Sequence, residues 1–171
     1  MNVFERFSLK DQVAIITGSA AGIGQAIAEL FAAAGASVVV SDLDIDNADS
    51  VAEKICQAGG QAISVFFDAT SEASRMDLVD AAIDEFGKIS LLVNNAGGGG
   101  PQPFDMPLET FESAYQLNVF SGFHLSQLCA PLMSRDGGGT ILNVNSMAGE
   151  NKNRRMSSYA SSKAAINHLT R

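Results

Sequence analysis

Val13-Ala-Ile-Ile-Thr-Gly-Ser-Ala-Ala-Gly-Ile-Gly24 joins a short apolar run to a glycine-rich turn. The run at residues 13–17 has the character of a strand that is buried on both faces. The residues after the turn carry apolar side chains at helical spacing, namely Ile23, Ile27, Leu30 and Phe31. Gly35 is a typical helix stop. The stretch therefore predicts a strand, a tight turn and a helix, which is the first part of a βαβ unit.

Strand-like and helix-like segments alternate through the rest of the chain. We expect further strands at residues 37–40, 62–66, 89–93 and 140–145, and helices at 47–58, 72–86, about 108–134 and from 157 to the last residue. Pro131 lies within the long helix, so we expect its last turn to kink or end there. This alternation favours an α/β fold of the Rossmann type, with a doubly wound parallel sheet of strand order 3-2-1-4-5.

Composition narrows the class of protein. The 171 residues, 46% of them apolar, suit a single domain over residues 1–171. A net charge of −8 argues against nucleic-acid binding, and the one basic cluster, residues 152–155, is better explained as a solvated loop than as a phosphate site. Cys56 and Cys129 lack metal-ligand spacing, so we expect no metal and a reducing, cytoplasmic location. No apolar run approaches membrane-spanning length.

The glycine turn has the spacing of a dinucleotide-binding site. Gly18, Gly22 and Gly24 let the backbone turn sharply and approach a ligand, and a helix opening at Ile23 presents free N–H groups and its positive dipole end. A pyrophosphate suits that position. A merely tight turn is the alternative, but the surrounding βαβ context favours the cofactor.

Asp42 closes the second predicted strand, 18 residues after Gly24. That spacing matches the acid that accepts hydrogen bonds from an adenosine ribose, and a carboxylate there repels a 2′-phosphate. No cation compensates, because Leu43 follows and the turn has only small residues at 19–21. We therefore expect NAD rather than NADP. The alternative for Asp42 is a turn residue ahead of Asp44.

Polar residues also follow the third and fourth predicted strands, at the edge of the sheet where ligands bind. We expect Asp68 and the adjacent Ala69 to contact the adenine, although an N-terminal helix cap is an alternative role for Asp68. Asn95 either braces the cofactor or satisfies the backbone of the loop.

Ser146, Tyr159 and Lys163 form a candidate acid–base constellation. Tyr159 and Lys163 lie one helical turn apart on one face. A free tyrosine has a pKa of about 10, and a nearby ammonium favours the phenolate. Ser146 can then hold a substrate oxygen, which gives acid–base chemistry beside a hydride acceptor. The alternative is that Tyr159 and Lys163 are ordinary helix residues without a catalytic role, and the upstream dinucleotide motif argues against it.

Together these residues resemble the short-chain dehydrogenase/reductase family. The matching residues are the glycine turn, Asn94-Asn-Ala-Gly97, Asn118, Ser146 and Tyr159-Ala-Ser-Ser-Lys163. The resemblance implies a catalytic tetrad of Asn118, Ser146, Tyr159 and Lys163. In it Tyr159 moves the proton, Ser146 polarises the substrate oxygen, Lys163 binds the nicotinamide ribose, and Asn118 supports a water in the proton relay. It also implies a homotetramer built through the long helix and the tyrosine helix.

Within the family, three stretches resemble bacterial members that use NAD and act on hydroxysteroids. They are residues 97–107, 117–127 and 150–153. The resemblance implies a hydroxysteroid substrate, namely a 7α-hydroxy bile acid, held by Ser146, Tyr159 and Asn151. The alternatives are a 3-oxoacyl-carrier-protein reductase or another carbonyl reductase, and a non-catalytic dinucleotide-binding protein. Family members carry two further strands and a substrate-binding helical segment after the tyrosine helix. The sequence has none of these, so we expect the chain to be truncated at its C-terminus.

Overall fold

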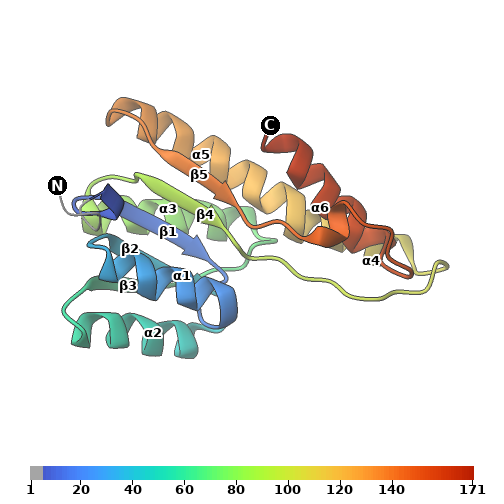
Figure 1. Ribbon diagram of the computed structural model, residues 1–171, viewed down its shortest axis with the longest axis horizontal. Helices are drawn as coiled ribbons and strands as arrows, with labels where there is room; N and C mark the ends of the chain where they lie inside the picture. Colours follow the sequence, from blue (N-terminus) through green and yellow to red (C-terminus); the bar gives the residue numbers. More distant parts are fainter. Residues whose placement is uncertain (1–5) are drawn as a thin grey trace.

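Five parallel strands form one sheet in the order β3-β2-β1-β4-β5 in the computed structural model, which describes residues 6–171 (Figure 1). The strands are β1 (Val13–Thr17), β2 (Ser37–Asp42), β3 (Gln61–Phe66), β4 (Leu91–Asn94) and β5 (Thr140–Asn143). Every neighbouring pair is parallel. The predicted fold class and strand order are therefore confirmed.

Helices cover both faces of the sheet (Figure 1). Their bounds are α1 Gly22–Ala33, α2 Ile45–Gln57, α3 Glu72–Phe86, α4 Leu108–Tyr115, α5 Ser121–Arg135 and α6 Ser157–Leu169, with a π-helical turn at Gln116–Phe120 and a 3₁₀ turn at Met147–Gly149. Side chains alternate between the faces of a strand. Ile16 accordingly packs in the core under α1 and α2, whereas Ile15 packs in the core under α3 and α5.

The first helix buries small residues most completely. The buried positions of α1 are Gly24, Ala28 and Ala32, and these small side chains let the helix axis approach the sheet closely. Of the apolar residues at helical spacing, Ile27 and Phe31 pack partly buried against the core, whereas Ile23 and Leu30 are each 66% exposed. Helical periodicity therefore located the helix correctly.

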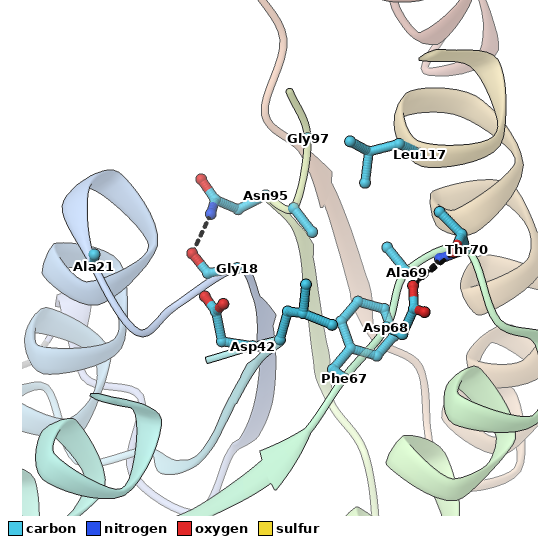
Figure 2. A pocket seen from close by; sticks show the side chains of 12 residues that line it. Gly18, Ala21, Asp42, Phe67, Asp68, Ala69, Thr70, Asn95, Gly97 and Leu117 are labelled. Atoms are coloured by element: carbon cyan, nitrogen blue, oxygen red, sulfur yellow. Dashed lines mark hydrogen bonds between the residues drawn. The ribbon is translucent and has the colours of Figure 1, made fainter. Parts of the chain in front are cut away.

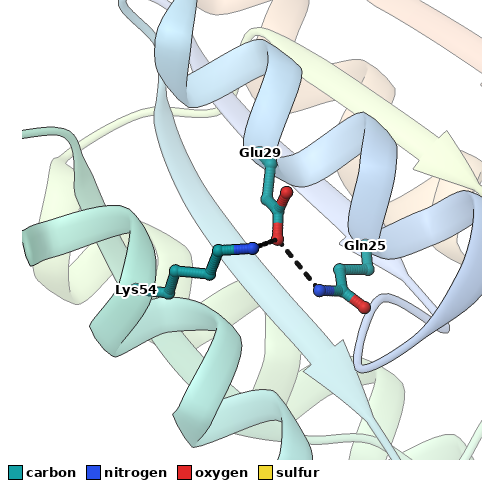
Figure 3. Close-up of polar contacts among 3 residues, drawn as sticks. All are labelled: Gln25, Glu29 and Lys54. Atoms are coloured by element: carbon teal, nitrogen blue, oxygen red, sulfur yellow. Dashed lines mark hydrogen bonds and ion pairs between the residues drawn. The ribbon is translucent and has the colours of Figure 1, made fainter. Parts of the chain in front are cut away.

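Helices α1 and α2, which cover the same face of the sheet, are also linked at the protein surface. Glu29 of α1 accepts hydrogen bonds from Lys54 Nζ at 2.8 Å and from Gln25 Nε2 at 2.9 Å (Figure 3). The bond from Lys54, followed by that from Gln25, lowers the pKa of Glu29 from its ordinary value. The lysine side chain is 65% exposed, so solvent screening keeps the energy of this pair small.

The long helix predicted at 108–134 is divided in the structure. A π-helical turn separates α4 from α5, and α5 continues through Pro131 to Arg135. Proline removes one N–H donor, but the following turn is held by bonds from Asp136 N to the carbonyl oxygens of Leu132 and Met133. Of the two outcomes expected at Pro131, an end of the helix is therefore wrong.

Two boundaries near the end of the chain also differ. The last strand stops at Asn143 instead of residue 145, because β4 ends at Asn94 and Val144 N makes the last bond between them, to Asn94 O. The last helix ends at Leu169, where Thr170 Oγ1 donates to Ile166 O at 2.8 Å. Within residues 6–171, no helix combines the length and apolar character needed to cross a membrane.

Candidate active site

The loops that follow the first four strands meet at the carboxyl edge of the sheet. They line a cavity of about 570 Å³ (Figure 2). Its wall consists of Gly18, Ala21, Asp42, Leu43, Phe67, Asp68, Ala69, Thr70, Asn95, Ala96, Gly97 and Leu117. The structure thus gathers six of the predicted cofactor residues, Gly18, Asp42, Leu43, Asp68, Ala69 and Asn95, around one cavity.

The other predicted cofactor residues of the turn, Gly22, Ile23 and Gly24, are not in the cavity wall. Gly24 allows close packing, because a Cβ there would lie 2.2 Å from Gly18 O. Gly22 has φ +59°, and a Cβ on it would meet no atom within 4 Å. No side chain caps α1, and its first turn has no acidic residue. The N–H groups that open α1 are therefore free to bind an anion such as a pyrophosphate.

Asp42 makes turn hydrogen bonds and also lines the cavity. Its Oδ1 accepts a bond from Asp44 N at 3.1 Å, as in a turn, and its Oδ2 accepts one from Ala20 N at 3.0 Å. The half-buried carboxylate also lines the cavity. No lysine or arginine of the described residues is in the cavity wall. The local charge is therefore that of a site that accepts a ribose and repels a phosphate.

Asp68 faces the cavity from the loop after β3. Its Oδ1 accepts bonds from Thr70 Oγ1 at 2.7 Å and from Thr70 N at 2.8 Å (Figure 2). These two bonds, the side-chain bond first, hold the pKa of Asp68 below its ordinary value. The N-cap of α3 is Ser71, which accepts from Ser74 N. The alternative role of Asp68 as that cap is therefore wrong.

Asn95 satisfies the backbone of the glycine turn. Its Nδ2 donates to Thr17 O at 2.9 Å and to Gly18 O at 2.8 Å (Figure 2). Thr17 Oγ1 in return accepts from the backbone N–H groups of Asn95 and Ala96, at 3.1 Å and 3.0 Å. Of the two roles considered for Asn95, the structure shows the second. The contribution of Thr17 was missed in the sequence, because nothing local marks its hydroxyl as a link between strands.

Tyr159 and Lys163 lie on α6 with the lysine buried. Lys163 is 6% exposed, and its Nζ donates to Val144 O at 2.9 Å. The same nitrogen is 6.0 Å from the centre of the Tyr159 ring. Burial lowers the pKa of Lys163. The carbonyl bond fixes the amino group beneath the tyrosine, which is the juxtaposition predicted from the i, i+4 spacing.

Asn118 anchors the glycine-rich segment to α6. It lies in the π-helical turn, 5% exposed, and its amide exchanges two 2.9 Å bonds with the backbone of Gly98. Its Nδ2 also donates to Ser162 Oγ at 3.1 Å. A Cβ on Gly97 would lie 2.8 Å from Asn118 Oδ1, and one on Gly99 would lie 2.8 Å from Tyr159 Cδ2. The segment therefore joins the cavity to the tyrosine.

Ser146 and Asn151 lie outside the cavity wall. Ser146 is half-buried and its Oγ accepts from Ala148 N at 3.1 Å, which caps the 3₁₀ turn. That turn packs on α6, since a Cβ on Gly149 would lie 2.8 Å from the carbonyl carbon of Lys163. Asn151 is exposed, as are the basic residues 152–155 that follow it. Ser146 is therefore held near the tyrosine helix, whereas Asn151 is open to solvent.

Comparison with known proteins identifies the class that this fold and site define. The short chain dehydrogenase family model matches residues 12–171. The chain therefore belongs to the short-chain dehydrogenase family. Within residues 6–171, no group of His, Cys, Asp and Glu side chains is placed to hold a metal ion.

Within this family, the chain is similar to several individual dehydrogenases. A 7α-hydroxysteroid dehydrogenase of Escherichia coli (strain K12) is 59% identical over 98% of this chain, and one of Bacteroides fragilis is 36% identical over 100% of it. A solved 7α-hydroxysteroid dehydrogenase, complexed with NADH and 7-oxo glycochenodeoxycholic acid, superposes with a TM-score of 0.97 at 58% identity, over 99% of this chain and 66% of that one. The chain also spans 66% of the length of both curated relatives.

Proposed function

We propose that this chain is part of an NAD-dependent oxidoreductase that interconverts a secondary alcohol and a ketone, with a 7α-hydroxy bile acid as substrate. The observation that carries the proposal is the 58% identity, at a TM-score of 0.97, to a structure that contains NADH and a 7-oxo bile acid. The cavity at the carboxyl edge and the buried Lys163 beside Tyr159 support it independently.

The residues of the cavity fit an NAD molecule. Asp42 presents a carboxylate for the adenosine ribose, and Asp68 and Ala69 form the wall for the adenine. The uncapped start of α1, with Gly22 open to solvent, accommodates the pyrophosphate. A chain of contacts from Gly97 to Lys163 then leads toward the nicotinamide end, since a Cβ on Gly97 would lie 3.1 Å from Lys163 Nζ.

The residues on and near α6 carry out the proton transfer of the proposed reaction. Bound NAD supplies the hydride acceptor for the alcohol carbon. Tyr159 takes the alcohol proton on its phenolate oxygen, and Ser146 holds the substrate oxygen by a hydrogen bond. Lys163, kept in place by Val144 O, holds its amino nitrogen 6.0 Å from the centre of the Tyr159 ring. Asn118 holds the Gly98 backbone and so the approach between the cavity and Tyr159. We also propose the exposed Asn151 as a substrate contact.

Two properties of the whole protein extend this proposal. Phe120 of the π-helical turn and Phe123 of α5 are each 48% exposed and leave an apolar face. We propose that this face is covered in a homotetramer, which light scattering on the intact protein tests directly. Both cysteines, Cys56 and Cys129, are free thiols, which suits a reducing cytoplasm.

A substrate panel tests the proposed activity. The intact protein is given NAD with 7α-hydroxy bile acids, with their 7β- and 3α-hydroxy isomers, and with no substrate, and NADH formation is followed. We expect NADH with the 7α-hydroxy compounds alone. Reduction of an acetoacetyl thioester with NADPH would instead support the carbonyl reductase alternative. Binding of NAD without turnover of any compound would support the non-catalytic alternative.

A further inference from the structure

A buried arginine lies behind the adenine wall of the cavity. Arg75 of α3 is 7% exposed. The two ion pairs found among the described residues, Lys54 with Glu29 and Arg135 with Asp136, do not include it. A buried charge without a carboxylate partner is costly unless its donors are satisfied. The position of Arg75 is therefore maintained by hydrogen bonds.

Those bonds tie the cavity wall to a distant helix. Arg75 Nη1 donates to Ala69 O at 2.6 Å, and Arg75 Nε donates to His124 Nδ1 at 3.0 Å. Ala69 forms the cavity wall between Asp68 and Thr70 (Figure 2), whereas His124 belongs to α5. The guanidinium thus links the loop after β3 to α5. Its partner there, His124, lies 49 residues after Arg75 in the chain.

The two hydrogen bonds from Arg75 constrain both His124 and the Ala69 carbonyl group. Arginine only donates hydrogen bonds, so His124 Nδ1 is the acceptor of the bond from Arg75 Nε. The Ala69 carbonyl is occupied by the guanidinium, which sets the orientation of the adjoining peptide groups in the wall. The charge of Arg75 also acts on Asp68, where it lowers the carboxyl pKa after the larger effect of Thr70.

We propose that Arg75, oriented by His124, is a positioning residue for recognition of the adenine end of the cofactor. It acts by holding the Ala69 carbonyl and thereby the wall formed by Asp68 and Ala69. The inference rests on the proposed binding of NAD in this cavity. It assigns to Arg75 no contact with the cofactor and no part in the proton transfer at Tyr159.

Replacement of Arg75 by methionine tests the inference in the intact protein. Methionine fills the buried volume and removes the charge, so the fold can be retained. We expect the KM for NAD and the dissociation constant of AMP, measured by calorimetry, to rise together by about tenfold, because the wall formed by Asp68 and Ala69 is no longer held in place by the bond from Arg75 to Ala69 O. The kcat and the KM for the bile acid should stay near the wild-type values. Arg135→Met, at an exposed arginine of α5, is the matched control.

Two variants of His124 separate positioning from general stability. Glutamine offers Nε of Arg75 a carbonyl acceptor, so His124→Gln should retain most of the AMP affinity, while His124→Phe should lose as much as Arg75→Met. Equal AMP affinity in Arg75→Met and the wild-type protein would overturn the inference. So would an equal loss of kcat and AMP affinity, which points to general damage.

The same measurements distinguish failure of the proposed function. A wild-type protein that binds AMP but forms no NADH with any bile acid would contradict the steroid dehydrogenase proposal, and the weaker AMP binding of Arg75→Met would still support the role of Arg75. A wild-type protein that binds no AMP would overturn the inference itself, because the cavity would then not be an adenine site.

Discussion

The Asp42 carboxylate accepts a hydrogen bond of 3.0 Å from the backbone N–H of Ala20. This bond connects the end of β2 to the glycine turn after β1. Asp42 therefore contributes both negative charge to the cavity and order to the turn that precedes α1. Changes at this position should alter cofactor choice and also weaken the binding of either cofactor.

We predict that Asp42→Ala combined with Leu43→Arg moves cofactor preference toward NADP. The change removes a repulsive carboxylate and adds a phosphate partner, so the ratio of kcat/KM for NAD over NADP should fall by about 10²-fold, using 1.5–3 kcal/mol for a charge-assisted bond. Affinity for NAD should also fall, because Ala20 N loses its acceptor. Asp46→Ala, which removes an exposed acid from the first turn of α2, is the control. Comparable use of NAD and NADP by the wild-type protein would contradict the prediction.

Tyr159→Phe should abolish chemistry and spare cofactor binding. The ring and its packing against Gly99 remain, but the acid–base oxygen is lost. We expect kcat to fall by about 10²–10⁴-fold, the range typical of general acid–base groups, with NAD affinity little changed by calorimetry. Tyr115→Phe keeps the stacked pair with Phe111 on α4, where the ring centres are 5.3 Å apart, and should have normal turnover. Near-normal turnover in the Tyr159 variant would be incompatible with the proposed mechanism.

Lys163→Met should change how stability depends on pH. Burial lowers the folded-state pKa of Lys163 below 10.5, so the folded protein binds fewer protons than the unfolded chain between these two values. Stability of the wild-type protein therefore rises with pH across that window, and the burial penalty is complete below it. The methionine variant lacks this contribution. Urea unfolding at a series of pH values should thus show that the free energy of unfolding of the variant falls relative to that of wild type as the pH approaches 10.5.

A control separates Lys163 from other lysines. Lys152→Met removes an exposed charge and should leave the pH profile of stability parallel to that of wild type. If Lys163→Met and wild type gave parallel profiles as well, the lysine would titrate normally in the folded state and the buried position would be wrong.

Gly24→Ala should destabilise the protein although alanine is the better helix former. The gain in helix propensity is about 1 kcal/mol, but the added Cβ would lie 2.2 Å from Gly18 O and 2.6 Å from Asn95 Nδ2. Overpacking of this kind costs about 1–3 kcal/mol or more, and it also displaces the turn that precedes α1. Urea unfolding and NAD binding should both weaken. Gly100→Ala, where a Cβ meets no atom within 4 Å, should match wild type in both measurements.

Several elements could be predicted from the sequence because their signals are local. The buried run of β1 and the glycine stop after α1 each depend on residues close together in the chain. How closely a helix packs, and whether it continues, depends on contacts outside the local pattern. In α1 close approach to the sheet buries Gly24, Ala28 and Ala32 and leaves Leu30 in solvent. In α5 the contacts that follow Pro131 maintain the helix.

The sequence by itself determined the order of strands and helices, the glycine turn at a helix start, and the spacing that places Tyr159 and Lys163 on one face of a helix. Only the tertiary structure decided which atoms those residues meet. Asn95 bonds Gly18 O across 77 positions, Asn118 bonds Gly98 across 20, and Arg75 bonds His124 across 49. The physical reason is that periodicity and propensity act within a few residues, whereas these hydrogen bonds depend on the register of neighbouring strands and on how closely each helix packs on the sheet.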